Sequence, residues 1–158
     1  MVPVATPRVV RLRSAKRHPS PYLSRRLTVL AYVRISKLVE RLPATDQVVP
    51  SVYALMDFAD QVPSREIAAN VVTMYTRVRV CDPNPNSTTQ AERELTLCYP
   101  HDADVDTGWV SVLSPVGCAL LGVAVGSTAT WDTPDGRQDS VQVCEILFQP
   151  EASGDFTR

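Results

Sequence analysis

The segment WVSVLSPVGCALLGVAVG, residues 109–126, decides the fold that we expect for this chain. It reads as a strand, a corner at Ser114 and Pro115, one short apolar helix and a glycine-ended turn into another strand. The Ser114 side chain can accept hydrogen bonds from the first helical turn, and Pro115 suits the first helical position because its missing N–H leaves no donor unpaired. Gly122 can adopt the left-handed conformation that ends a helix. Because the segment contains no catalytic group, it predicts a docking corner.

Alternating apolar residues on both sides of this segment predict a sheet. We expect strands over residues 71–80, 92–99, 109–113, 128–132 and 140–148. Together with the helix over residues 114–122, these strands indicate an α+β domain that spans residues 63–158. Leu121 and Val123 are expected in its core.

Two stretches with helical periodicity precede the predicted domain, over residues 27–42 and 50–62, and each is followed by a proline. They predict a short antiparallel helical hairpin over residues 27–62, although residues 27–30 also fit a short strand. Each arm has at most about 14 residues and therefore a reach of roughly 20 Å.

Charge is distributed unevenly along the chain. Of its 16 basic and 17 acidic residues, seven basic and no acidic ones fall within residues 1–26, which leaves nine basic and 17 acidic over the remaining 132. Several prolines interrupt this basic arm, so we expect it to be disordered by itself. Such an arm can make weak contacts to nucleic acid by releasing counterions, or can simply keep the chain soluble.

The bulk properties indicate a cytoplasmic chain with a real core. Hydrophobic residues make up 44% of the sequence. No apolar run approaches the roughly 20 residues needed to span a bilayer, and the N-terminus does not resemble a signal peptide. The four cysteines show no Cys-x-x-Cys spacing, and we expect them to be reduced and mostly buried.

The sequence offers little for catalysis. The chain has only two histidines, His18 in the basic arm and His101, and no nucleophile motif or phosphate-binding loop. The acidic run after His101, residues 102–106, lacks the regular ligand spacing of a calcium loop and is expected to be solvated. We therefore predict a protein that is not an enzyme, with no cofactor, no metal, no membrane contact and no small-molecule substrate.

Several segments resemble the GreA/GreB transcription factor family, and within it the Rnk branch of regulators of nucleoside diphosphate kinase. The resemblance rests on residues 109–126, on NVVTMYTRVR at 70–79, on LCYPHDAD at 97–104 and on FQPEASGD at 148–155. It covers roughly residues 27–155 in the expected order. It implies an FKBP-like antiparallel sheet with its helix packed on one face.

The resemblance also implies a partner and a site. The corner at Ser114 and Pro115 would contact the rim of the RNA polymerase secondary channel, with Val116, Ala119 and Leu120 supporting or extending that contact. In Gre factors, acidic residues at the tip of a long coiled-coil hairpin help to hold the catalytic Mg²⁺ of the polymerase.

The predicted hairpin is much shorter and lacks the acidic tip motif. Its tip carries Glu40 and Asp46, which we expect to be solvated. The chain would therefore compete with Gre-type factors without stimulating RNA cleavage. Two alternatives remain: a nucleic-acid-associated regulator that acts through residues 1–26, and a peptidyl-prolyl isomerase.

Overall fold

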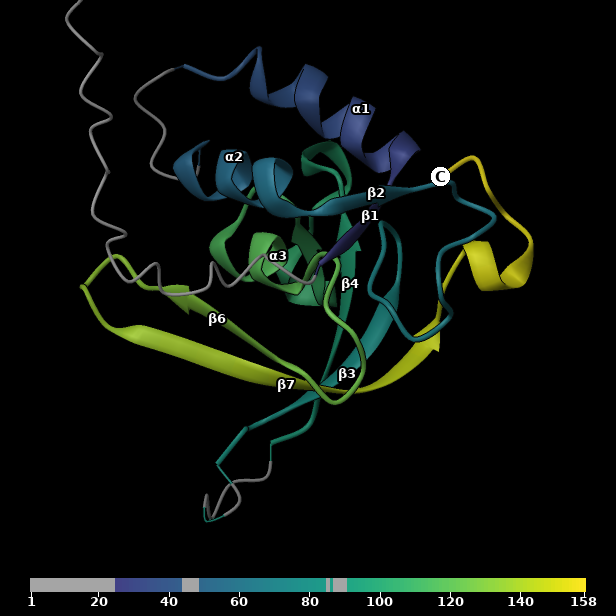
Figure 1. Ribbon diagram of the computed structural model, residues 1–158. Helices are drawn as coiled ribbons and strands as arrows, with labels where there is room; N and C mark the ends of the chain where they lie inside the picture. Colours follow the sequence, from purple (N-terminus) through teal and green to yellow (C-terminus); the bar gives the residue numbers. More distant parts are fainter. Residues whose placement is uncertain (1–24, 44–48, 85, 87–90) are drawn as a thin grey trace, which may run out of the picture.

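Five strands form the main sheet of the computed structural model, which describes residues 25–43, 49–84, 86 and 91–158 (Figure 1). Across the sheet the order is β5 (Trp109–Ser111), β4 (Arg93–Cys98), β3 (Arg77–Cys81), β7 (Gln138–Phe148) and β6 (Thr128–Asp132). All neighbours are antiparallel except β4 and β5, which run parallel because a connection with two 3₁₀ turns lies between them. The α+β class is confirmed, and the sheet is antiparallel-rich rather than wholly antiparallel.

Among the described residues, three α-helices lie on one side of this curled sheet. Figure 1 shows α3 (Pro115–Leu120) next to the sheet, with α2 (Val49–Phe58) and α1 (Val29–Val39) above it. None of the helices within the described ranges is long and apolar enough to cross a membrane. The helix α1 begins where the Thr28 hydroxyl accepts a hydrogen bond from the N–H of Ala31 at 3.1 Å.

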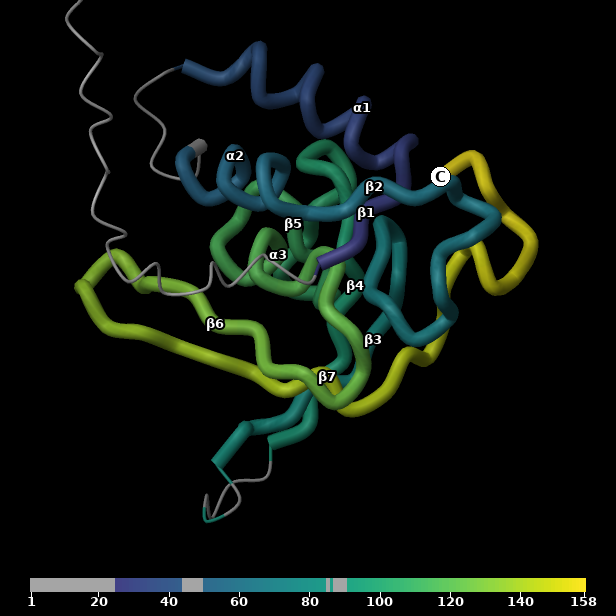
Figure 2. The backbone as a smooth tube through the Cα atoms, viewed as in Figure 1, coloured from purple at the N-terminus to yellow at the C-terminus, as the bar shows by residue number. Residues whose placement is uncertain are grey.

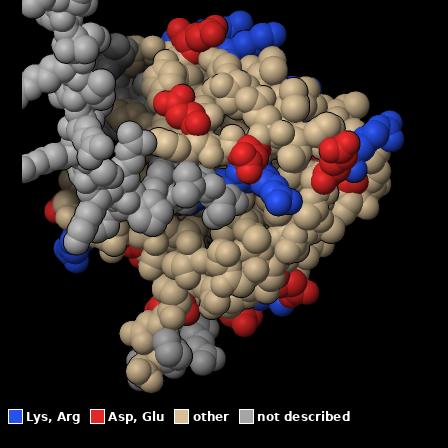
Figure 3. Space-filling model, in the orientation of Figure 1, with Lys and Arg blue, Asp and Glu red and all other residues tan. Residues whose placement is uncertain are grey.

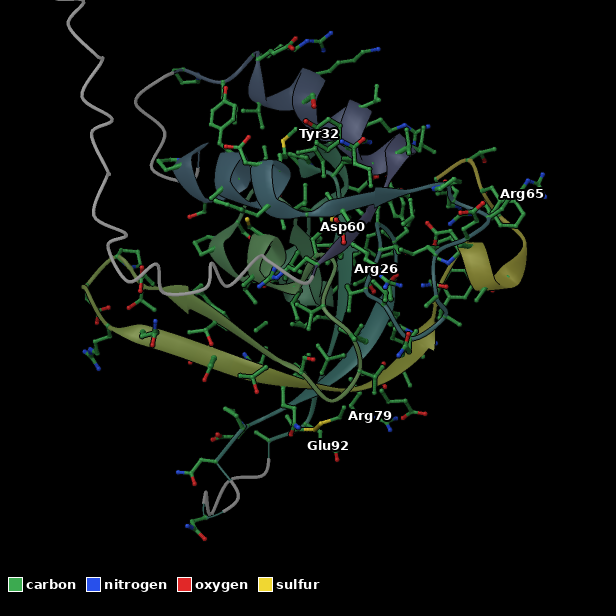
Figure 4. All side chains as sticks on the ribbon, viewed as in Figure 1. Arg26, Tyr32, Asp60, Arg65, Arg79 and Glu92 are labelled. Atoms are coloured by element: carbon green, nitrogen blue, oxygen red, sulfur yellow. A yellow bond between two sulfur atoms is a disulfide. The ribbon has the colours of Figure 1, made fainter. Side chains whose placement is uncertain are left out.

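Two short strands flank the first two helices and replace part of the predicted helical stretches. The strand β1 (Arg26–Thr28) precedes α1, and β2 (Asp60–Val62) follows α2. They pair in parallel, with Arg26 opposite Asp60, and Figure 4 shows these two side chains on neighbouring strands. The helix predicted over residues 50–62 therefore ends four residues early, and the strand alternative for residues 27–30 is partly correct.

The core fills the space between the helices and the sheet. Buried residues of α1 recur at the helical spacing of four, as Ala31, Ile35 and Val39. They form one cluster with α2, α3 and the inner face of the sheet, whose members include Val52, Leu55, Val78, Val80, Leu97, Leu120, Leu121, Val123 and Val143. The core positions expected for Leu121 and Val123 are confirmed, at 1% and 5% exposure.

The strand predicted over residues 71–80 starts only at Arg77, because a turn precedes it. Tyr75 in this turn has φ 61°, which no strand residue adopts. The turn is held from inside, where the Thr73 hydroxyl donates to Glu151 at 2.7 Å and contacts the Thr76 hydroxyl at 2.8 Å. A local alternation of apolar residues therefore does not continue as a strand where buried polar contacts impose a turn.

The terminal segment after β7 packs against the rest of the fold. The Gln149 side chain donates to the carbonyl oxygens of Ala68 and Val71, at 2.9 and 2.8 Å. The carbonyl of Thr157 accepts a hydrogen bond from Arg34 of α1 at 2.9 Å. Figure 2 shows the C-terminus close to β2 and to the start of α1, which agrees with this contact.

The cysteine prediction is half correct. Cys98 and Cys118 are buried free thiols, as expected. Cys81 and Cys144 instead form a disulfide between β3 and β7, with their Cα atoms 6.3 Å apart. The two residues are 63 positions apart in the sequence, so only the pairing of β3 with β7 brings them together. Figure 4 shows the disulfide near Arg79, a β3 residue that forms ion pairs with Glu92 and Glu145.

Candidate partner-binding surface

The predicted corner forms at the start of α3, and its caps are those that the sequence predicts. The hydroxyl of Ser114 accepts a hydrogen bond from the N–H of Gly117 at 3.1 Å and donates one to the carbonyl of Ser111 at 2.6 Å. Pro115 occupies the first helical position and is exposed. Because the Ser114 hydroxyl donates one hydrogen bond and accepts another within the corner, this residue fixes the shape of the corner. Pro115 is the residue that the corner presents to solvent.

Two glycines allow the corner to pack closely. A Cβ atom at Gly117 would overlap the carbonyl oxygen of Ser111, so only glycine lets α3 approach β5 in this way. Gly122 has φ 80°, as predicted for a helix end, and a Cβ there would lie 2.9 Å from the carbonyl oxygen of Arg26. The helix is therefore held against β5 on one side and against β1 on the other.

Arg25 holds the opposite end of α3. Its guanidinium donates to the carbonyl oxygens of Cys118 at 3.1 Å and Leu121 at 3.2 Å, and the residue is only 5% exposed. A cation at a helix C-terminus satisfies carbonyls that have no partner within the helix. Burial raises the pKa of the Cys118 thiol to about 11, against the opposing effect of the Arg25 charge.

The position of Arg25 corrects the predicted boundary of the basic arm. The sequence analysis places residues 1–26 in one disordered arm. Arg25 is instead buried and Arg26 belongs to β1, so both are part of the folded body. Residues 1–24 lie outside the described part of the chain. No sequence signal distinguishes Arg25 from the other arginines of the arm, since its partners are 93 and 96 residues away.

An open groove of about 640 Å³ adjoins the corner. Its apolar lining comes from β4, the 3₁₀ turn before β5, β5 itself, α3 and β6, and comprises Leu95, Val105, Val110, Pro115, Val116 and Trp131. Charged residues of both signs also line it, namely Arg93, Glu94, Asp106 and Asp139. Val105 is 84% exposed, unusually so for a valine. The sequence analysis missed these residues, except Pro115 and Val116, because they converge only in the folded sheet.

The structure separates the predicted contact residues into a surface layer and a buried layer. Pro115 is exposed, and Ser114 and Val116 are half-buried. Ala119 and Leu120 are 3% and 0% exposed, so they cannot touch a partner and can only support the corner from below. The physical reason is that α3 is enclosed beyond its start, since the four consecutive residues Gly117, Cys118, Ala119 and Leu120 are all buried.

Of the two predicted tip residues, the structure describes only Glu40. Glu40 is exposed directly after α1, where its N–H donates to the carbonyl of Ser36 at 3.0 Å. Asp46 lies outside the described residues. Figure 3 shows acidic and basic side chains interspersed over the visible described surface, without a large patch of one sign.

The acidic run after His101 serves local structure. Asp102 accepts a hydrogen bond from the Tyr75 hydroxyl at 2.6 Å and lies 3.2 Å from His101, and Asp104 caps the next 3₁₀ turn. Burial, together with the neighbouring Asp102 carboxylate, raises the pKa of Tyr75 far above its ordinary value. Within the described ranges, no three or more His, Cys, Asp or Glu residues are grouped in a way that could hold a metal ion.

Comparisons with known proteins agree with this geometry. The family described as "Transcription elongation factor, GreA/GreB, C-term" matches residues 67–148, which include α3 and the groove. The chain is 35% identical over 128 residues to the "Regulator of nucleoside diphosphate kinase" of Escherichia coli (strain K12), covering 78% of this chain and 88% of that protein.

Two further relatives carry the elongation-factor description. The chain is 42% identical over 84 residues to "Transcription elongation factor GreA" of Thermodesulfovibrio yellowstonii, covering 53% of this chain and half of that protein. A solved structure, "Prokaryotic transcription elongation factor GreA/GreB from Nitrosomonas europaea", is 32% identical with a TM-score of 0.64. It is matched over 79% of this chain and 98% of its own.

Proposed function

Because the chain belongs to the GreA/GreB transcription elongation factor family, we propose that it binds RNA polymerase at the rim of the secondary channel and regulates transcription without cleaving RNA. In this role the chain is not an enzyme. It occupies the rim and competes there with Gre-type cleavage factors, as the resemblance to the Rnk branch implies.

The observation that carries this proposal is the exposed Pro115 beside the apolar groove. Protein interfaces are built from a small apolar centre that excludes water, surrounded by a polar rim. Pro115, Val116, Val105 and Trp131 supply such a centre, and the charged residues of the groove supply the rim. The corner is also rigid, since Ser114, Gly117 and Arg25 fix α3 from both ends, so little conformational entropy is lost when a partner binds.

We expect no RNA cleavage because the helices of this chain are too short to reach the polymerase active site. In this proposal α1 and α2 are the short counterpart of the Gre hairpin, and Glu40 lies near its tip. The 11 residues of α1 span only about 16 Å. A carboxylate assists a metal only when it comes to about 2 Å from the ion. The chain would therefore block the rim without delivering a carboxylate to the polymerase active site.

The test is a titration of the full chain into stalled bacterial elongation complexes, with and without a Gre factor, while cleavage of the nascent RNA is followed. We expect suppression of Gre-stimulated cleavage and no cleavage by the chain alone. Pro115→Glu should abolish the suppression, because it places a charge in the apolar centre. Pro100→Glu is the matched control, since Pro100 is also exposed at the first position of a short helix. In both variants the new glutamate lies at a helix N-terminus, where a negative charge is tolerated.

Other outcomes would favour other functions. Undiminished suppression by Pro115→Glu would refute the site, and cleavage by the chain alone would refute the argument from reach. Salt-sensitive binding to DNA or RNA that requires residues 1–24 would favour a nucleic-acid-associated regulator. If the chain is instead a peptidyl-prolyl isomerase, it would isomerise a proline peptide in the absence of polymerase.

A further inference from the structure

We propose that residues 1–24 of this chain bind back onto its own groove at Pro115 and compete there with RNA polymerase. The arm is then an inhibitor of docking and no part of the docking surface. This contact deepens the proposed function and rests on it, because the groove is the surface that polymerase would occupy. The place where the arm joins the folded body, the charge of the groove and the sequence of the arm all support it.

The arm joins the folded body close to the groove. Arg25, the first described residue, donates to two carbonyl oxygens at the end of α3, whereas Pro115 begins the same helix and lines the groove. The six residues of α3 span only about 9 Å. An extended chain of 24 residues reaches up to about 80 Å, so the arm is long enough to cover the groove. A segment tethered nearby has an effective concentration on the order of 1 mM, so weak contacts suffice to hold it.

The groove offers acidic side chains that have no cationic partner. Glu94, Asp106 and Asp139 line it and are exposed, and none of the three forms an ion pair within the described part of the chain. Together with Arg93 they give the described lining a net charge of −2. Residues 1–24 carry five basic residues and no acidic one. The arm and the groove are therefore complementary in charge.

The apolar part of the groove is open and lies beside a free sheet edge. Val105 is 84% exposed, and Pro115 is exposed as well. Exposed apolar patches of this kind are typical of contact surfaces. Trp131 belongs to β6, the last strand of the sheet, whose N–H and C=O groups form no hydrogen bond to a described residue outside the sheet. An extended segment can pair with such an edge.

The arm contains a segment that matches both parts of the groove. Within VVRLR, residues 9–13, Val10 and Leu12 alternate with Arg11 and Arg13. In an extended segment, successive side chains point to opposite sides. The two apolar side chains would therefore face the apolar lining, and the long arginine side chains would bring their charges to the acidic residues at the rim.

The first experiment is zero-length cross-linking of the full chain with a carbodiimide, which joins an amine to a carboxylate in direct contact. The chain has two lysines, Lys16 in the arm and Lys37 on α1, so mass spectrometry of the cross-linked peptides identifies the amine. We expect Lys16 to be joined to Glu94, Asp106 or Asp139 of the same chain. The yield should fall at least about tenfold between about 50 mM and 1 M salt, because salt screens the attraction.

Two outcomes of the cross-linking would overturn the contact. The first is linkage of Lys16 to carboxylates spread over the whole surface, for which the products of Lys37 give the background. The second is linkage that occurs only between two chains, since the groove would then hold the arm of a second copy.

A pair of groove substitutions and a matched control pair test the site. Glu94→Gln with Asp106→Asn removes two acidic charges of the groove. Asp57→Asn with Glu66→Gln removes two exposed acidic charges outside it, which likewise form no ion pair with the described residues. We expect the linkage of Lys16 to Asp139 to decrease only in the groove pair. An equal decrease in both pairs would mean that net charge alone attracts the arm.

Inhibition of docking is tested with a full chain whose five basic arm residues are replaced by glutamine. This variant keeps the length of the chain, Arg25 and β1. If the arm occupies the groove for about nine tenths of the time, about tenfold less of the variant suppresses Gre-stimulated cleavage. An unchanged or higher concentration for half-suppression would overturn the inhibition. The cross-link needs no polymerase, so a chain that forms it without suppressing cleavage refutes the proposed function alone, and suppression without the cross-link refutes the arm contact alone.

Discussion

Replacing Arg25 by methionine should destabilise the whole fold, although the residue adjoins the basic arm. Methionine keeps most of the apolar stem but removes the two hydrogen bonds to the carbonyls of Cys118 and Leu121. A hydrogen bond to a charged group contributes about 1.5–3 kcal/mol, and part of this gain is offset by the cost of burying the guanidinium. We therefore expect a loss of about 3 kcal/mol in the free energy of unfolding. For a domain of this size, that corresponds to a fall of roughly 6–12 °C in the melting temperature.

The assay is urea unfolding of the full chain, followed by tryptophan fluorescence. Arg26→Met is the matched control, because Arg26 is exposed and its contact to Gly122 is made by the backbone N–H. The control should leave the midpoint unchanged, while Arg25→Met should lower the midpoint without changing the slope of the transition. Equal midpoints for the two variants would refute the conclusion that Arg25 holds α3.

Two further predictions concern groups that local sequence rules do not identify. Gly117→Ala should cost more than about 3 kcal/mol, because its Cβ would overlap the carbonyl of Ser111; a thermal melt close to that of the unaltered chain would contradict the close approach. Burial raises the pKa of Glu151 above its ordinary value of 4.5, against the hydrogen bond from Thr73, so ionisation disfavours the folded state and stability should decrease as pH rises above about 4.5. Glu151→Gln should remove this dependence in denaturation curves at several pH values, and an unchanged pH profile would show that another group causes it.

Local rules predict the corner well because each of its determinants lies within a few residues of its partner. Ser114 caps the N–H of a residue three positions later, and Gly122 ends the helix through its own backbone conformation. The strands β4, β6 and β7 are likewise close to their predicted bounds, since one face of each packs on the core. In these elements the local preference and the tertiary environment agree.

The sequence analysis fails where a distant partner overrides the local pattern. The turn at Tyr75 depends on Thr73 and Glu151, which are 78 residues apart. The disulfide joins Cys81 to Cys144 across 63 residues, and no cysteine spacing indicates it. The groove likewise collects side chains from several segments, and only the fold places them side by side.

These long-range contacts also decide how the basic arm should be tested. A truncation at the predicted boundary, after residue 26, would delete Arg25 together with the first residue of β1. The shortened chain would then lose the support of α3, and binding to polymerase could fail because the corner is displaced. A truncation after residue 24 leaves both contacts intact and removes only the charge of the arm. If this second chain still suppresses Gre-stimulated cleavage while the first does not, the difference measures how far the corner depends on Arg25 and β1, and the arm has no part in docking.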